Sequence, residues 1–214
     1  MARASERRAV LFDWDGTLVD SADRTFRCYA QVFAVYGIRF DREAFERTYS
    51  PDWYRTYEGV GLPREEWADA DARWVACYET ETSRLVDGAR DGLERLARAG
   101  RVLGVVSSGD ASRVRSEMAA LGVAALFATA VCGGETARRK PHPEPLLTAL
   151  GKLAVSPAEC VYVGDSPEDV AMARAAGAMA VGIPGGFPNR EALKASSPDL
   201  LVPSLDAAVA ALLG

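Results

Sequence analysis

The chain has 214 residues and a net charge of −5, with 49% hydrophobic and 26% charged residues. This length and composition are typical of a globular protein with a single domain, or with a core and a small inserted lobe. The acidic balance argues against a partner such as nucleic acid or an anionic membrane surface, and no apolar run approaches the roughly 20 residues of a membrane span, so we expect a cytoplasmic protein.

The first predicted element is a short apolar strand at residues 8–12. Residues 18–86 follow it without a clear strand pattern, and their apolar side chains recur at helical spacing. Examples are Phe26, Tyr29 and Phe33, and later Trp67, Trp74 and Tyr78. We therefore predict that residues 18–86 form a small helical cap domain, inserted after the first strand.

From residue 87 onward, strand and helix patterns alternate. Short apolar runs predict buried strands at residues 101–106, 127–132, 159–165 and 178–184. Amphipathic helical patterns lie between these runs, and a last helical pattern occupies residues 204–214. Such alternation is typical of an α/β fold with a parallel sheet covered by helices on both faces. The predicted core comprises residues 1–17 and 87–214.

Two carboxylates follow the first strand directly. Asp13 and Asp15 are two residues apart, so on an extended chain their side chains point to the same side, and Gly16 then permits a sharp turn. Ligands of open parallel sheets bind at the carboxyl ends of the strands, which is where this pair lies. Taken alone, the pattern is as consistent with a solvated turn as with a functional site.

Three later strands also end in polar residues. Ser107 and Ser108 follow the second strand, Lys140 follows the third on a loop bounded by prolines, and Asp165 and Asp169 follow the fourth. Each has an ordinary structural alternative. Ser108 or Asp110 can serve to cap the next helix, the lysine can be a solvated surface residue, and Asp169 can complete a capping box.

Together, these residues fit phosphoryl transfer. Several carboxylates repel a phosphate dianion, so the site requires cations, which Mg²⁺ and Lys140 supply. Asp13 can then attack phosphorus and form an aspartyl-phosphate, while Asp15 donates a proton to the leaving oxygen and later activates water. Ser107, Ser108 and Lys140 are the predicted phosphate ligands.

The segments FDWDGTLVDS, VVSSG, KPHPEP and VGDSPED, in this order, resemble the four motifs of the haloacid dehalogenase superfamily of phosphatases. The resemblance covers nearly the whole chain and is nearest to the phosphoglycolate phosphatases and related small phosphomonoesterases. It implies a Rossmann-like core with a helical cap, and a small phosphorylated metabolite as substrate. It also implies Mg²⁺ held by Asp13, Asp165 and the carbonyl of Asp15, with Asp169 orienting the metal shell.

Other branches of this superfamily are tested by the same residues. The dehalogenases lack the second aspartate, which is present here as Asp15. The phosphonate-cleaving branch needs a lysine in its cap, but no lysine precedes Lys140. A β-phosphoglucomutase-like mutase remains an alternative, although its members usually hold a cap histidine or lysine and this cap has neither. A non-catalytic phosphate-binding regulatory module is a third possibility, but all the catalytic residues are present.

Substrate specificity is expected to reside in the cap. Because the cap contains no lysine, its arginines are the candidate contacts for polar groups of the substrate. Arg55 is the first candidate, since it lies among Trp53, Tyr54 and Tyr57 beside a glycine-bearing segment. A solvated surface arginine is an equally good interpretation.

Overall fold

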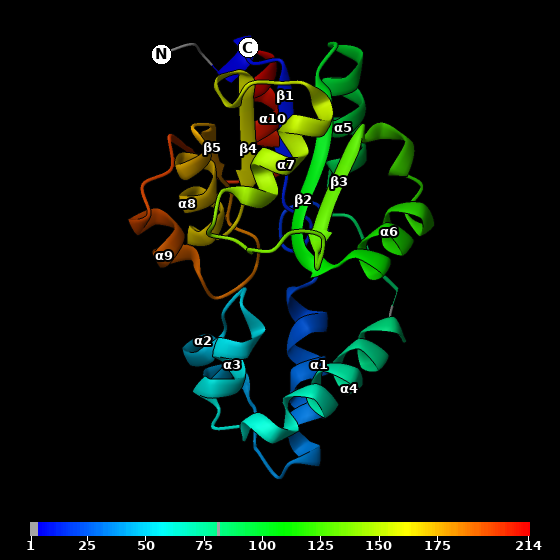
Figure 1. Ribbon diagram of the computed structural model, residues 1–214, viewed down its shortest axis with the longest axis vertical. Helices are drawn as coiled ribbons and strands as arrows, with labels where there is room; N and C mark the ends of the chain where they lie inside the picture. Colours follow the sequence, from blue (N-terminus) through cyan, green and yellow to red (C-terminus); the bar gives the residue numbers. More distant parts are fainter. Residues whose placement is uncertain (1–3, 81) are drawn as a thin grey trace.

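The structure, a computed structural model, describes residues 4–80 and 82–214. Its core is a six-stranded parallel sheet with the strand order β3-β2-β1-β4-β5-β6 (Figure 1). The strands are β1 (Ala9–Phe12), β2 (Val102–Asp110), β3 (Thr129–Gly133), β4 (Cys160–Gly164), β5 (Met179–Gly182) and β6 (Leu200–Leu201). The predicted α/β class and parallel sheet are therefore confirmed.

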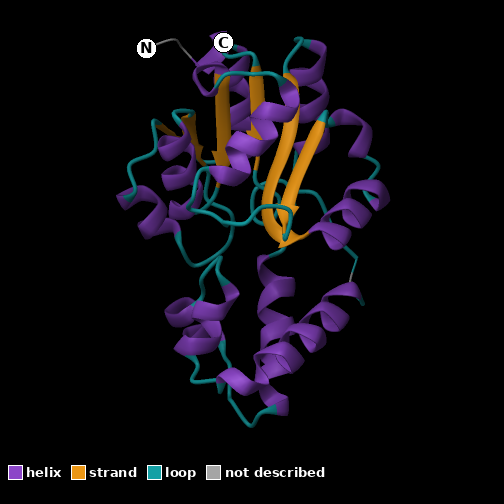
Figure 2. Ribbon diagram, in the orientation of Figure 1, coloured by secondary structure: helices purple, strands orange, loops and turns teal. Residues whose placement is uncertain are grey.

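Helices cover both faces of this sheet (Figure 2). One face packs against α5 (Ala89–Arg98), α6 (Ala111–Ala120) and α10 (Leu205–Leu213). The other packs against α7 (Glu144–Leu153), α8 (Pro167–Ala176) and α9 (Arg190–Ala195). Alternate side chains of each strand enter the two apolar layers, which explains why the strands read as continuous apolar runs. The sequence patterns missed α9 and β6, because six and two residues are too few for a recognisable period.

A helical cap lies beyond the carboxyl ends of the strands (Figure 1). It contains α1 (Ala22–Val35), α2 (Arg42–Thr48), α3 (Trp53–Gly59) and α4 (Trp67–Glu79), inserted between β1 and β2. An aromatic cluster centred on Tyr29, Phe33, Phe40 and Tyr57 holds these helices together.

The two segments that join the cap to the core run side by side. The Asp20 amide donates to the Arg84 carbonyl at 2.9 Å, and the Val86 amide donates to the Leu18 carbonyl at 3.0 Å. The division of the chain at residues 18 and 86 remains a prediction, and this pairing is compatible with it. No helix within the described ranges is long and apolar enough to cross a membrane.

Candidate active site

The site forms where β1 ends. The Asp13 amide donates to the Val163 carbonyl at 2.9 Å, which extends the pairing of β1 with β4 by one residue. Gly16 then turns with φ at +80°, and a Cβ at this position would lie 2.3 Å from Oδ2 of Asp165. A Cβ on Gly185 would lie 2.1 Å from the same oxygen. Both glycines are required because the Asp165 carboxylate is packed directly against the backbone.

Lys140 joins two of the carboxylates. Its Nζ lies 2.7 Å from Oδ1 of Asp13 and 2.7 Å from Oδ1 of Asp169, and 5% of its side chain is exposed. Burial opposes the charge of Lys140, but the two carboxylates outweigh it and raise its pKa. The predicted alternative of a solvated lysine is wrong, because the loop after β3 brings it into the buried end of the sheet.

Asp169 has both a structural and a site contact. Its Oδ2 accepts the amides of Asp165 and Ser166 and the Ser166 hydroxyl, at 3.2, 3.1 and 2.8 Å, which completes the predicted capping box of α8. Its Oδ1 faces Lys140. The capping box of α8 therefore fixes the Asp169 carboxylate in the position from which it contacts Lys140.

Three carboxylates form a cluster that fits a cation. Oxygens of Asp13, Asp165 and Asp169 lie within 4.8 Å of one another, and all three residues are buried. Oδ2 of Asp165 is buried with no hydrogen-bond partner among the described residues. Burial, despite Lys140, raises the pKa of Asp13 to about 7, and burial with the charges of Asp13 and Asp169 raises the pKa of Asp165 well above its usual value. A hard divalent cation would relieve this repulsion and satisfy the free oxygen.

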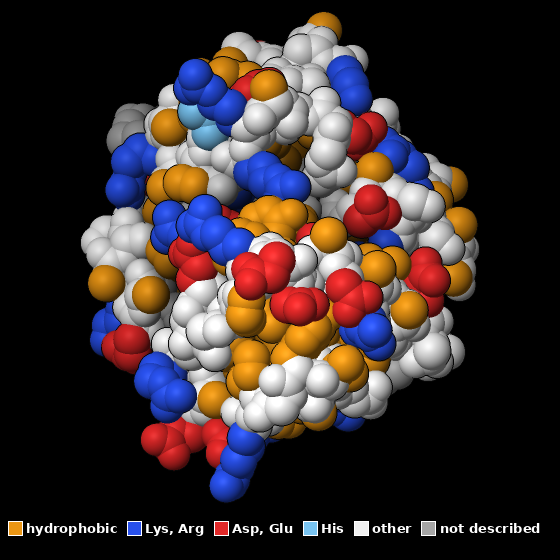
Figure 3. Space-filling view, turned by 60° about the horizontal axis from the view of Figure 1, so that its bottom comes forward, with side chains coloured by type: hydrophobic (Ala, Val, Ile, Leu, Met, Phe, Trp, Pro, Cys, Tyr) orange, Lys and Arg blue, Asp and Glu red, His pale blue; other side chains and the backbone are white. Residues whose placement is uncertain are grey.

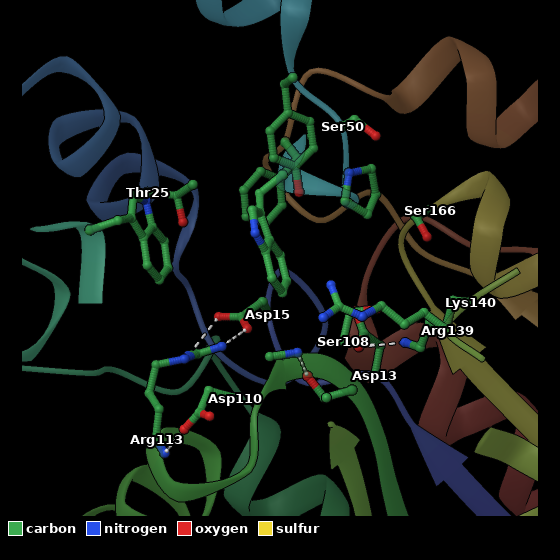
Figure 4. Close-up of a pocket in the computed structure, with 18 of the residues that line it drawn as sticks. Asp13, Asp15, Thr25, Ser50, Ser108, Asp110, Arg113, Arg139, Lys140 and Ser166 are labelled. Carbon is green, nitrogen blue, oxygen red and sulfur yellow. Dashed lines mark hydrogen bonds and ion pairs between the residues drawn. The ribbon is translucent and has the colours of Figure 1, made fainter. Parts of the chain in front are cut away.

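Asp15 points toward Arg113 (Figure 4), and it also accepts from Tyr78. The Arg113 Nη2 lies 2.6 Å from Oδ2 of Asp15, and the Tyr78 hydroxyl donates to Oδ1 at 3.0 Å. Burial acts to raise the pKa of Asp15, but Arg113 and Tyr78 outweigh it and hold that pKa below its usual value. The two aspartates that the sequence places on one side thus have different partners.

Arg113 belongs to a buried network that the sequence did not reveal. Its Nη1 lies 3.0 Å from Glu117, which also accepts from Trp14, Ser83 and Arg24. The only sequence signal was a charged pair spaced four residues apart on one helix, and such pairs usually lie on the solvated face. Here the pair faces inward, because the cap covers the start of α6.

The serine segment is strand rather than helix terminus. Ser107 and Ser108 lie near the end of β2, where the pairing with β3 is irregular, and both line the cavity described below. The Ser107 Oγ accepts the Gly109 amide at 3.0 Å. The N-cap of α6 is Asp110, one of the two predicted candidates, which accepts the amides of Ser112 and Arg113. Ser107 and Ser108 do not cap this helix and remain in the lining of the cavity.

A cavity of about 350 Å³ separates the carboxylates from the cap. All the core residues predicted for the site line it: Asp13, Asp15, Ser107, Ser108, Lys140, Asp165 and Asp169. Cap residues missed by the sequence analysis also line it, among them Thr25, Ser50, Asp71 and Trp74.

Arg55 does not line the cavity. Trp53 and Tyr57 are four residues apart on α3 and face inward, so Arg55, halfway between them, points to the opposite side. Its side chain is 70% exposed and lies 3.8 Å from Asp52. The expectation that Arg55 contacts the substrate is not supported by this arrangement. An arginine that does line the cavity beside a cap aromatic is Arg139 from the core, whose Cζ lies 4.5 Å from the Trp53 ring centroid.

Comparisons with known proteins identify the family of this chain. A family model described as haloacid dehalogenase-like hydrolase matches residues 10–183. A phosphoglycolate phosphatase of Yersinia pseudotuberculosis is 32% identical over 216 residues, which cover 94% of this chain and 91% of that protein.

Solved structures share the fold. A haloacid dehalogenase-like hydrolase from Streptococcus pneumoniae has a TM-score of 0.84 at 21% identity, covering 96% of this chain and 98% of that one. CbbY from Rhodobacter sphaeroides, solved in complex with phosphate, has a TM-score of 0.76 at 26% identity and covers 93% and 95%. The chain therefore belongs to the haloacid dehalogenase-like hydrolase family and stands among its phosphatases.

Proposed function

We propose that this chain is a Mg²⁺-dependent phosphomonoester hydrolase that acts on a small phosphorylated metabolite through an aspartyl-phosphate on Asp13. The observation that carries the proposal is the pairing of Lys140 with Asp13 and Asp169 beside the free carboxylate oxygen of Asp165. A nucleophilic carboxylate, a fixed cation and an incomplete metal shell meet at the ends of adjacent strands. These are the parts that phosphoryl transfer requires.

The donor set fits Mg²⁺. In this proposal the side chains of Asp13 and Asp165 and the carbonyl of Asp15 hold the ion, and Asp169 orients the surrounding groups. All of these ligands are oxygens, which hard divalent cations prefer. When bound, the ion neutralises charge on the phosphate and polarises its oxygens.

The reaction has two displacements at phosphorus. An oxygen of Asp13 bonds to phosphorus as the bond from phosphorus to the ester oxygen breaks, and Asp15 transfers its proton to that oxygen to release the alcohol. Water then attacks phosphorus, Asp15 takes up its proton, and the bond between phosphorus and Asp13 breaks. Inorganic phosphate leaves and both carboxyl groups return to their starting state. Ser107, Ser108 and Lys140 hold the phosphoryl oxygens throughout.

The contacts of Asp15 fit one half of this cycle. Paired with Arg113, the carboxyl is held as the anion, which is the form that activates water. Proton donation to the leaving oxygen requires the neutral form, and the carboxyl must then face the phosphate. We infer that the Asp15–Arg113 pair opens and that Asp15 takes up a proton from solvent before the first displacement. After Asp15 has accepted the proton of the attacking water, it releases a proton to solvent and Arg113 receives the anion again.

The test is acid quenching during turnover of p-nitrophenyl phosphate with Mg²⁺, followed by peptide mass mapping. We expect one phosphate on the peptide that contains Asp13, and loss of both turnover and labelling in excess chelator, with recovery when Mg²⁺ is added back. Full turnover in excess chelator, or phosphate on a different residue, would show that the mechanism is wrong.

A further inference from the structure

The cavity has an aromatic wall. Six aromatic side chains line it, five from the cap and one from the core: Tyr29, Tyr49, Trp53, Tyr57, Trp74 and Phe187. Tyr49 and Phe187 stack with ring centroids 4.5 Å apart and an angle of 10° between their planes. Trp74 stacks on Tyr78 at 4.4 Å. Stacked pairs such as these present fixed flat surfaces, and flat apolar groups pack best against them.

Two polar groups in this wall have no partner. The indole nitrogens of Trp53 and Trp74 are buried and make no hydrogen bond to any described residue. A buried N–H without an acceptor is costly, so an acceptor supplied by a ligand would be favourable there. The Tyr57 hydroxyl, by contrast, already donates to Asp71 at 2.9 Å.

The charges of the cap residues in this wall argue against a substrate whose anionic group is bound by the cap. Among the described cap residues that line the cavity there is no lysine or arginine, and the one charged group is the carboxylate of Asp71. The core supplies Arg113, which is paired with Asp15 and Glu117, and Arg139, which points into the cavity (Figure 4) and lies over the Trp53 ring. A substrate carboxylate would therefore find its cation on the core, at Arg139, and none among the described cap residues that line the cavity.

The surface over the cavity is mixed. Near the centre of the view in Figure 3, hydrophobic and acidic side chains lie among one another, and basic side chains lie above them. The space behind is about 350 Å³, which lies within the range of sites that bind whole small molecules. A phosphate with a two-carbon acid would occupy a small part of it.

We propose that the substrate is the phosphate ester of an alcohol that carries a flat, uncharged ring with a hydrogen-bond acceptor, and not the ester of a small hydroxy acid. This inference rests on the proposed phosphatase function. The phosphate would lie against Asp13 and Lys140, the ring would lie among the cap aromatics, and the acceptor would face the Trp74 indole.

The test compares four phosphate esters of primary alcohols, so that the leaving oxygens differ little in basicity. They are ethyl phosphate, phosphoglycolate, 2-phenylethyl phosphate and 2-(4-acetylphenyl)ethyl phosphate. We expect kcat/KM for 2-phenylethyl phosphate to exceed that for ethyl phosphate and phosphoglycolate by about tenfold or more, because the ring buries apolar surface. The acetyl compound should be better still. A kcat/KM for phosphoglycolate equal to or above that of both ring esters would overturn the inference.

Two substitutions of Trp74 distinguish the contribution of its flat ring from that of its indole N–H donor. Trp74→Leu should reduce the ratio of kcat/KM between 2-phenylethyl and ethyl phosphate severalfold. Trp74→Phe should keep most of that ratio but remove the advantage of the acetyl compound. Trp67 supplies the matched control, because it lies in the cap outside the cavity lining and its indole already donates to the Leu62 carbonyl at 3.0 Å. Trp67→Phe should leave both ratios as in the wild type, and equal effects at the two tryptophans would contradict the proposed role of Trp74.

Failure of this inference is distinguishable from failure of the proposed function. If p-nitrophenyl phosphate is hydrolysed and phosphoglycolate is the best of the four esters, the enzyme is a phosphatase and the substrate class is wrong. If neither p-nitrophenyl phosphate nor any of the four esters is hydrolysed with Mg²⁺ present, the proposed function itself is wrong.

Discussion

At the scale of single residues, the buried charges of the site form two groups. Asp13, Asp165 and Asp169 share one cation, Lys140, so with all three carboxylates ionised this group is two positive charges short of neutrality, which Mg²⁺ would supply. Asp15 belongs to the other group and is neutralised by Arg113. Asp13 and Asp15, the proposed nucleophile and its proposed proton-transfer partner, lie two residues apart in the chain but differ in their surroundings.

The first prediction concerns the nucleophile. Asp13→Asn should lower kcat by at least about a thousandfold, because an amide cannot attack phosphorus. The variant should still fold, since the amide has nearly the shape of the carboxylate and carries no buried charge. Turnover of p-nitrophenyl phosphate and circular dichroism check the two statements. Persistent turnover in a preparation shown by mass spectrometry to be free of deamidated protein would contradict a covalent role for Asp13.

The second prediction concerns Lys140. Lys140→Met should lower kcat about a hundred- to a thousandfold, since the phosphoryl oxygens lose a fixed donor. It should also lower the free energy of unfolding by about 3–5 kcal/mol, because two buried carboxylates are left without their cation. Lys152→Met is the control, since Lys152 is exposed on α7. Steady-state kinetics and urea unfolding measure both effects, and similar results for the two variants would remove Lys140 from the site.

At the scale of elements, Glu117 on α6 connects the cap to the core. Its carboxylate accepts from Trp14 after β1, from Arg24 on α1 and from Ser83 in the second connecting segment. Arg113, one turn earlier on α6, extends the same network to Asp15. Both segments that connect cap and core thus contact α6, and the same helix binds Asp15, the proposed proton-transfer residue, through Arg113.

We therefore expect Glu117→Gln to be strongly destabilising. The amide removes the negative charge that pairs with both buried arginines of this network, and loss of one partner of a buried ion pair costs about 3–5 kcal/mol. The surface pair of Glu58 and Arg64 provides the comparison, and Glu58→Gln should cost at most about 1 kcal/mol. Unfolding in urea gives both values. If the two substitutions cost the same, Glu117 does not hold the network together.

At the scale of the whole molecule, metal binding should be coupled to stability. A cation that binds only the folded carboxylate cluster stabilises the protein by about 2.7 kcal/mol at a hundredfold excess over its Kd, which is a Tm increase of several degrees for a chain of this size. Thermal unfolding with and without Mg²⁺ measures this increase. Asp165→Asn should abolish it, whereas Asp206→Asn, at an exposed position on α10, should retain it. An unchanged Mg²⁺ response in Asp165→Asn would place the ion elsewhere.

The sequence by itself determined the arrangement of the core. Apolar runs alternating with amphipathic helices require a parallel sheet, and parallel strands end at one edge, so Asp13, Ser107, Lys140 and Asp165 had to lie near one another. The helical period between the first two strands was likewise enough to predict a cap. These inferences succeeded because each depends on a local pattern and on the topology that such patterns allow.

Only the tertiary structure decided which charges pair. Arg113 lies 98 residues from Asp15 in the chain, and its burial depends on the cap covering α6. Arg55 shows the opposite outcome: the sequence suggested a site residue, but only its aromatic neighbours Trp53 and Tyr57 line the cavity. The physical reason is that a charged side chain has no periodic signature of its own. Whether it is solvated or buried, and which partner neutralises it, depends on the packing of segments that are far apart in the sequence.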